Sequence, residues 1–209
     1  MNISIILAHP YAQSFNHGLA QTLHEALVKA GHTVRFHDLQ AEHFDPVMTV
    51  EELGTDQSTD PLVIQHQQEL MTSDGIIAIH PNWWGQPPAI LKGWIDRVLR
   101  QGVAYTFGLL PNGKHGPQGL LPVKTLLVFT TSNTPNEVED QVLHNPLQSI
   151  WTQYVAGFCC FPTVKRTNFS VVVSSTPEVR QAWLAEARKT ALELFPAQVQ
   201  NGSFGMDCA

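Results

Sequence analysis

Residues 75–79 constrain the fold of this chain more than any other stretch of its sequence. They form an apolar run with three isoleucines, which is typical of a strand buried on both faces. Apolar residues then recur at helical spacing from Ile90 onward, so a helix is expected to begin near Pro88. A buried strand followed directly by a helix predicts a parallel sheet covered by helices. The intervening turn then lies at the carboxyl edge of the sheet, where such folds bind ligands.

The same alternation of strand and helix runs through the rest of the chain. Ser14 and Thr176 are the predicted N-caps of the first and last helices. The order predicts an α/β fold of flavodoxin-like type, a doubly wound, five-stranded parallel sheet of order 2-1-3-4-5. One domain is expected over residues 1–195 and a tail over residues 196–209. The predicted strands are 3–8, 33–39, 75–79, 123–130 and 163–173, and the predicted helices are 15–30, 62–71, 88–101, 138–155 and 177–194.

Three segments do not fit this alternation. The first turn, residues 9–14, contains no glycine, which argues against dinucleotide binding of the Rossmann kind. Residues 40–60 are polar and are predicted to be irregular. Residues 102–122 are predicted to form a long loop, which is typical of a functional segment. This segment contains more apolar residues than a loop that is fully exposed to solvent would carry. The preceding helix has a wide apolar face as well, and together the two predict a homodimer interface.

Charge and cysteine content exclude several classes of function. Lys+Arg number 12 against 18 Asp+Glu, a net charge of −6 without a basic cluster, so nucleic-acid binding is not expected. The start of the chain does not resemble a signal peptide and no apolar run reaches membrane-spanning length, so a cytoplasmic protein without membrane insertion is expected. The three cysteines and ten scattered histidines have no metal-ligand spacing, so no metal is predicted. Cys159 and Cys160 are interpreted as inert buried thiols.

Two short segments carry a resemblance to a known family. Residues 88–94 read Pro-Ala-Ile-Leu-Lys-Gly-Trp after an aromatic turn, and Ala8-His9 is followed by Ser14-Phe15-Asn16. In both, the chain resembles the flavin-dependent NAD(P)H:quinone oxidoreductases. The resemblance implies ping-pong transfer of two electrons from NADH or NADPH through a flavin to a quinone-like acceptor. FMN is favoured over FAD because the chain is shorter than the mammalian FAD enzymes. An alternative of another class is a flavin-bearing regulatory subunit of a membrane transporter of the potassium-efflux type.

The resemblance also implies which residues hold the flavin. A helix N-terminus favours an anion, so the first turn is expected to bind the flavin phosphate. Two loops, here called the first and second ring loops, are expected to bind the flavin ring through backbone N–H groups. Two alternatives remain: Ser14 and His9 have only structural roles in the turn, and the two indoles pack under the next loop. The expected residues are His9, Gln13, Ser14, Phe15 and Asn16 in the first turn, Pro81, Asn82, Trp83, Trp84 and Gly85 in the first ring loop, and Thr130, Thr131, Ser132 and Asn133 in the second.

Four further residues are expected to act around the ring or the cofactor's far end. His144 falls where the family has a proton-handling histidine, and the alternative is an ordinary surface histidine. The tyrosine that partners it in mammalian members is absent, with Val138 near its place. Tyr105 and Phe107 are expected to contact the acceptor, from a loop of one subunit that covers the flavin of the other. Arg180 resembles a residue that reaches the adenine half of FAD in longer members, and the alternative is a solvated residue of a helix's first turn.

Overall fold

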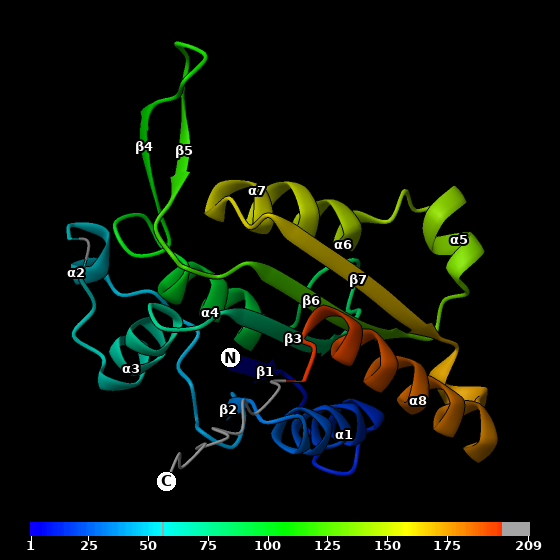
Figure 1. Cartoon of the computed structure of the whole chain (residues 1–209). Helices are drawn as coiled ribbons and strands as arrows, with labels where there is room; N and C mark the ends of the chain where they lie inside the picture. The colour runs from blue at the N-terminus through cyan, green and yellow to red at the C-terminus, as the bar shows by residue number, and fades with distance from the viewer. Residues whose placement is uncertain (56, 198–209) are drawn as a thin grey trace, which may run out of the picture.

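The computed structural model describes residues 1–55 and 57–197, so most of the predicted tail lies outside the described residues. At its centre is a parallel sheet of five strands (Figure 1). Counted among the strands of this sheet, the order is 2-1-3-4-5, so the predicted flavodoxin-like fold is confirmed. In spatial order the strands are β2 (Thr33–Asp38), β1 (Asn2–Leu7), β3 (Gly75–Pro81), β6 (Thr125–Ser132) and β7 (Thr163–Ser170).

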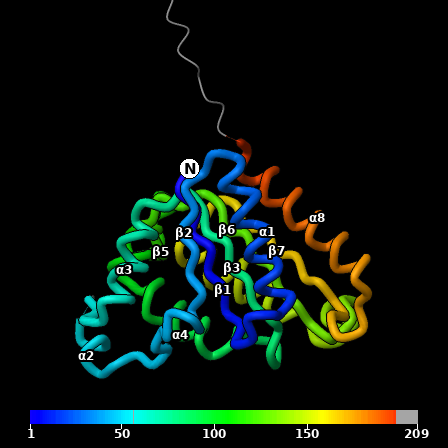
Figure 2. The backbone as a smooth tube through the Cα atoms, turned by 90° about the horizontal axis from the view of Figure 1, so that it is seen from below, coloured from blue at the N-terminus to red at the C-terminus, as the bar shows by residue number. Residues whose placement is uncertain are grey.

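Helices cover both faces of this sheet (Figure 2). On one face lie α1 (Phe15–Lys29) and α8 (Pro177–Leu194), and on the other lie α3 (Pro61–Leu70) and α4 (Ala89–Val98). β3 is buried along its whole length because its side chains alternate between the two helical layers. Ile77 packs in the layer of α1 and α8, whereas its neighbour Ile76 packs in the layer of α3 and α4. The continuous apolar run in the sequence follows from this double burial.

The two predicted N-caps are confirmed. Ser14 Oγ accepts the N–H of His17 over 3.3 Å, and Thr176 Oγ1 accepts the N–H of Val179 over 3.4 Å. The helix predicted over residues 138–155 is interrupted at Asn145, because this residue has a φ of 43° and caps the next helix. The predicted helix 138–155 is therefore a series of short pieces, namely α5 (Asn136–Gln141), α6 (Pro146–Ser149), the π-helical η1 (Ile150–Val155) and α7 (Ala156–Cys159).

The loop predicted over residues 102–122 is wrong for much of its length. β4 (Tyr105–Leu109) pairs with β5 (His115–Gly119) as an antiparallel hairpin, and Gly113 turns between them with a φ of 78°. The hairpin projects away from the body of the domain, beside the end where β6 begins (Figure 1). Because both hairpin strands are largely exposed, they lack the apolar alternation that marks a half-buried strand.

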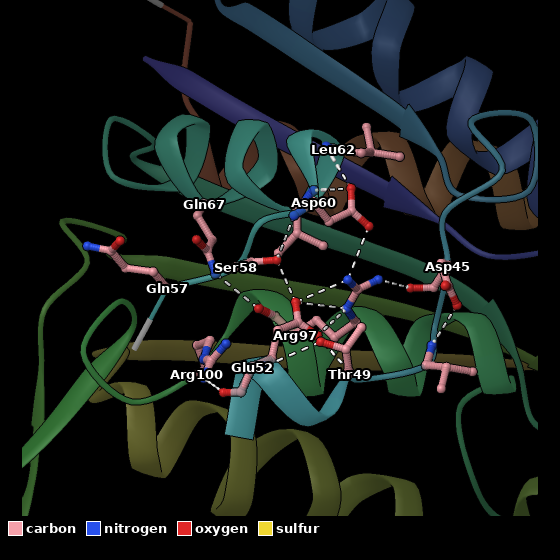
Figure 3. Close-up of polar contacts among 12 residues, drawn as sticks. Asp45, Thr49, Glu52, Gln57, Ser58, Asp60, Leu62, Gln67, Arg97 and Arg100 are labelled. Carbon is pink, nitrogen blue, oxygen red and sulfur yellow. Dashed lines mark hydrogen bonds and ion pairs between the residues drawn. The ribbon is translucent and has the colours of Figure 1, made fainter. Parts of the chain in front are cut away.

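The segment between β2 and α3 is held on α4 by buried charges (Figure 3). It contains a short helix, α2 (Val50–Leu53). Arg97 and Glu52 are each 2% exposed and their charged atoms lie 3.0 Å apart, while Asp60 lies 3.1 Å from the same guanidinium. Burial alone would raise the pKa of Glu52, but hydrogen bonds from Arg97 and Ser58 lower it to about 2. A polar sequence can thus be ordered by one ion-paired network.

The expectation of two buried thiols is wrong for one of them. Cys159 is buried, and burial raises the pKa of its thiol to about 12. Cys160 is exposed, because the chain turns there with a φ of 55° at the end of α7. Among the described residues, no helix has the length and apolar character needed to cross a membrane.

Candidate functional site

Three turns meet at the carboxyl edge of the sheet, after β1, β3 and β6. The rings of His9 and Trp83 lie 6.3 Å apart between the first two turns. Asn16 donates its side-chain amide to Thr131 Oγ1 over 3.0 Å, which joins α1 to the second ring loop. The backbone N–H of Asn82 donates to the Thr131 carbonyl over 2.7 Å, which joins the two ring loops. The structure therefore brings together the three segments predicted to form one site.

The first turn leaves free donors at the N-terminus of α1. The first N–H groups of a helix have no intrahelical acceptor, and Ser14 caps only that of His17. The N–H groups of Phe15 and Asn16 therefore remain available, and the first turn of α1 carries no acidic residue. The Phe15 ring packs against Trp183 at 5.6 Å, so this residue offers its backbone and not its side chain.

His9 and Gln13 are placed differently at this helix end. The N–H of Tyr11 donates to Nδ1 of His9 over 3.1 Å, so the proton of the neutral ring is on Nε2. Burial lowers the pKa of His9, which favours that neutral ring. Gln13 is exposed, and its side-chain oxygen accepts the Tyr11 hydroxyl over 2.6 Å. Together with the free N–H groups of α1, the His9 Nε2–H gives a donor set suited to an anion.

The first ring loop is a tight turn with one free backbone donor. Trp83 and Gln86 exchange backbone hydrogen bonds of 3.1 and 3.0 Å, and the Gly85 N–H donates to Asn82 Oδ1 over 2.9 Å. From Asn82 to Gln86, only the N–H of Trp84 has no partner within the described residues. Trp84 has a φ of 57° and is fully exposed, and Trp83 is 45% exposed. The alternative that both indoles pack in the interior is therefore wrong.

The second ring loop uses its side chains to hold its own shape. Thr130 is fully buried and donates to Asn168 over 2.8 Å, so its hydroxyl is not available to a ligand. Ser132 donates to the Thr134 carbonyl over 2.8 Å, and Asn133 Oδ1 accepts the N–H of Val173 over 2.9 Å. The N–H groups of Asn133 and Thr134 have no partner in the part of the chain that the structure describes. These two N–H groups are the donors that the loop can present.

His144 lies on the turn between α5 and α6, beside the first ring loop. It is exposed and has a φ of 55°. Pro146, two residues later, sits against Gly85, where an added Cβ would come within 2.7 Å of the proline Cγ. The His144 side chain makes no hydrogen bond to another described residue. Its predicted role in proton handling therefore stays a prediction.

Tyr105 and Phe107 are not part of the same edge of the sheet. They lie on the hairpin, at the end where β6 begins, and form an aromatic cluster with Phe158 at centroid distances of 5.5 to 6.0 Å. Tyr105 and Phe158 also line a cavity of about 660 Å³ between α2, α4 and η1. A smaller cavity of about 360 Å³, lined by His9 and Trp83 among others, lies at the first turn and the first ring loop. Within one chain, Tyr105 on the hairpin and the turns at the carboxyl edge of the sheet therefore line different cavities.

Comparisons with known proteins give the family. The model of the flavodoxin-like fold family matches residues 1–194. The chain is 31% identical over 206 residues to ribosyldihydronicotinamide dehydrogenase (quinone) of Mus musculus, covering 88% of this chain and 87% of that one. The chain belongs to the quinone oxidoreductase family with a flavodoxin-like fold. It is also 29% identical over 211 residues to NAD(P)H dehydrogenase (quinone) 1 of Rattus norvegicus, covering 90% of this chain and 75% of that one.

Solved structures agree with the flavodoxin-like fold. Smu.1420 from Streptococcus mutans UA159 matches with a TM-score of 0.80 at 30% identity, covering 92% of this chain and 100% of that one. An FMN-dependent NADH-azoreductase from Bacillus anthracis str. Ames Ancestor, solved in complex with FMN, matches with a TM-score of 0.70 at 16% identity. That match covers 93% of this chain and 99% of the azoreductase, and at this identity it shows the fold alone.

In this member of the quinone oxidoreductase family, the fold also brings together two histidines that are far apart in the sequence. His37, Glu42 and His66 bring their ligand atoms within 4.8 Å of one another, a grouping that could hold a metal ion. However, the Trp94 indole N–H donates to Nδ1 of His66 over 2.8 Å, so Nδ1 is unprotonated and Nε2 carries the proton. A protonated Nε2 cannot bind a metal, and both nitrogens of His37 are already bonded, to Glu42 over 2.9 Å and to Glu69 over 2.6 Å. We therefore interpret the cluster as a hydrogen-bond network.

The sequence missed these contacts because the partners are far apart in the chain. His37 is at the end of β2 and His66 is on α3, yet their rings lie 4.0 Å apart. Phe158 was missed for the same reason, since its aromatic partners come from the hairpin. The only local signal was a histidine or an aromatic residue in an amphipathic segment, which is common in cores.

Proposed function

We propose that this protein is a flavin-dependent NAD(P)H:quinone oxidoreductase. The observation that carries the proposal is the convergence, at one edge of the sheet, of backbone N–H groups from three turns that have no hydrogen-bond partner among the described residues. They belong to Phe15 and Asn16 in the first turn, Trp84 in the first ring loop, and Asn133 and Thr134 in the second. A flavin carries a phosphate at one end and an electron-rich pyrimidine edge at the other, so this donor set fits it.

Each turn has a distinct role in this proposal. The N-terminus of α1 and the Nε2–H of His9 hold the flavin phosphate, because a helix end and a neutral imidazole donor favour an anion. Trp84 and the second ring loop donate N–H groups to the pyrimidine edge. The exposed indoles of Trp83 and Trp84 offer flat apolar surface and exclude water from the ring. A flavin held by these residues would supply the two-electron chemistry that oxidises NADH or NADPH and, with protons, reduces a quinone to hydroquinone.

FMN is the proposed cofactor. The similar azoreductase structure is a complex with FMN. In this chain Arg180, which resembles a residue that reaches the adenine half of FAD, donates to Ser175 Oγ over 2.8 Å and to the Val172 carbonyl over 3.1 Å. The guanidinium thus holds the turn η2 (Val172–Ser174) and is not presented to an adenine nucleotide. Mass spectrometry of the flavin released by denaturation tests this assignment, and FAD as the only flavin would contradict it.

The acceptor site is proposed to need two chains. Tyr105 and Phe107 lie at the opposite end of the domain from the three turns, so they do not reach the flavin of their own chain. A two-fold dimer in which the hairpin of one chain covers the turns of the other would place them there. We therefore propose that the protein is a homodimer and that its acceptor is a flat, quinone-like molecule. We also propose that it is cytoplasmic.

The experiment that tests the function is oxidation of NADH or NADPH by the purified protein with and without added quinone. Turnover that depends on quinone and gives hydroquinone in equal amount supports the proposal. A protein that binds flavin but oxidises NAD(P)H at no measurable rate would contradict it. The transporter-subunit alternative gains no support from the relatives described above.

A further inference from the structure

Glu139 is a buried carboxylate beneath the first ring loop. It lies on α5 and is 3% exposed. Its Oε1 accepts the side-chain N–H of Asn82 over 2.6 Å, a length typical of a charge-assisted hydrogen bond. Its Oε2 is buried and has no hydrogen-bond partner among the described residues. Burying a carboxylate is costly unless it is hydrogen-bonded, so the bond from Asn82 is an important contact of this side chain.

The contact decides which way the Asn82 amide faces. An ionised carboxylate can only accept hydrogen bonds, so Asn82 must present its NH₂ to Glu139. The amide oxygen is then directed to the other side, where it accepts the N–H of Gly85 over 2.9 Å. If the amide were reversed, both contacts would be lost at once. Through Asn82, Glu139 therefore closes the first ring loop and leaves the N–H of Trp84 as its free donor.

The chain that follows Glu139 supports the same loop at a second point. The N–H of Asn145 donates to the Glu139 carbonyl over 2.8 Å, and the next residue, Pro146, packs on Gly85. His144 directly precedes these two anchors. The first ring loop and the turn that carries His144 are thus one packed unit, with Glu139 at its base.

A half-buried arginine, Arg166, interacts electrostatically with Glu139. Arg166 on β7 donates to Asn145 Oδ1 over 2.9 Å, while its Nε and Nη2 are buried without a partner among the described residues. Burial lowers the pKa of Arg166, and the charges of Glu139 and Asp140 act against that effect. The charges of the two carboxylates therefore offset part of the cost of burying the guanidinium.

We propose that Glu139 is a positioning residue, which orients the Asn82 amide and thereby fixes the first ring loop in the conformation that receives the flavin ring. The proposal rests on the proposed function, since the loop is there assigned to the flavin. It concerns this chain's own residues, and its first consequence is measurable without any flavin. The Gly85 N–H should be protected from hydrogen exchange in the free protein because it is bonded to Asn82.

Two variants of equal side-chain length separate the hydrogen bond from simple packing. Glu139→Gln keeps an oxygen that accepts from Asn82, whereas Glu139→Met does not. In the flavin-free protein, Glu139→Met should speed hydrogen exchange of the Gly85 amide by about tenfold or more, the scale of one lost charge-assisted bond. It should raise the Kd for FMN by a similar factor. Glu139→Gln should retain most of the protection and affinity. Glu137→Met, at an exposed position of the same helix, is the matched control.

The outcomes separate this inference from the proposed function. If the wild-type protein binds neither FMN nor FAD, the proposed function fails while the exchange result still tests the anchoring of the loop. If Glu139→Met leaves both Gly85 exchange and FMN affinity unchanged, or if Glu139→Gln loses as much as Glu139→Met, the positioning role is overturned. Should Glu139→Met not fold, Asn82→Ala serves instead, because Asn82 is only half-buried. Unchanged exchange and affinity in that variant would also overturn the inference.

Discussion

Trp151 donates its indole N–H to Nε2 of His80 over 3.0 Å, and this bond fixes which nitrogen of the histidine carries the proton. Because Nε2 accepts, Nδ1 is protonated and donates to the Pro81 carbonyl over 2.8 Å. Burial lowers the pKa of His80 to about 3, so the ring is neutral near physiological pH. Pro81, the first residue of the first ring loop, thus accepts a hydrogen bond from the neutral ring of His80, and Trp151 fixes that ring.

Replacing Trp151 with Phe should leave His80 Nε2 buried without a donor. The expected loss is about 1–3 kcal/mol in the free energy of unfolding, the cost of one unsatisfied buried polar group. Denaturant unfolding measures it, with Trp84→Phe as a control at a fully exposed tryptophan. Equal stability of the two variants would contradict the role of this bond. For wild type, the free energy of unfolding should fall as pH drops below 6.5, because the unfolded chain then binds a proton at His80 that the folded chain does not.

The contacts of His37 with Glu42 and Glu69 predict that the free energy of unfolding depends on pH in the opposite direction. Burial alone would lower the pKa of His37, but the bonds and charges of Glu42 and Glu69 raise it above 6.5. Its contribution to stability is therefore complete below pH 6.5 and is lost as pH rises through the raised pKa. His37→Gln should remove this alkaline loss. The free energy of unfolding, measured on both sides of that range, checks it, and His115→Gln at an exposed position is the control. A variant that keeps the wild-type slope would count against the assignment.

The buried pair of Glu52 and Arg97 should be sensitive to the loss of one charge. Glu52→Gln leaves the guanidinium with less compensation, and such broken buried pairs typically cost about 3–5 kcal/mol. Because the pKa of Glu52 is lowered to about 2, its contribution should persist above pH 4.5 and be lost as pH falls from there toward 2. Glu51→Gln, at the exposed neighbouring position, is the control. If Glu52→Gln and Glu51→Gln unfold at the same denaturant concentration, the network does not hold this segment.

The features that could be predicted from the sequence are those whose interacting residues lie close together along the chain. Ser14 and Thr176 were predicted as caps because a cap bonds to a residue three positions away. The order of the strands followed from the alternation of buried runs with helices, which each element carries in its own residues. Glu139 gave no such signal, because its partner Asn82 is 57 positions away, in the loop that follows β3.

The same reasoning explains which parts of the candidate site were predicted wrongly. Thr130 was expected in the second ring loop, which is proposed to bind through backbone N–H groups, and its hydroxyl is turned to Asn168 on the neighbouring strand, a partner that the local sequence does not reveal. The hairpin over residues 105–119 was expected to be a loop, because exposed strands have no apolar face to reveal them. Tertiary contacts decide both outcomes.

Replacing Trp84 with Ala should change ligand binding without changing stability. Its side chain is fully exposed, so the free energy of unfolding should stay within about 0.5 kcal/mol of wild type. Lost stacking of roughly 1–3 kcal/mol, by analogy with bases on aromatic rings, should raise the Kd for FMN about tenfold or more. Fluorescence titration with FMN and urea unfolding measure the two quantities. An unstable variant whose folded fraction keeps full affinity would show that the indole is structural.

The proposed dimer makes a prediction that only a shared site satisfies. Phe107 is 51% exposed on the hairpin, whereas Asn82 lies in the first ring loop at the other end of the domain. If each site combines the turns of one chain with the hairpin of the other, Phe107→Ala and Asn82→Ala should each lose quinone reduction when purified alone. In a mixed dimer one site then carries both defects and the other carries none.

Unfolding and refolding the two variants together should therefore restore activity. Random pairing at equal amounts makes half of the dimers mixed, so about a quarter of all sites are intact and about a quarter of wild-type activity should return. Light scattering over a dilution series establishes the dimer independently. Each variant refolded alone is the control for recovery by refolding itself. A mixture no more active than the two variants refolded separately, or a monomer that reduces quinone at full rate, would show that each chain carries a complete site.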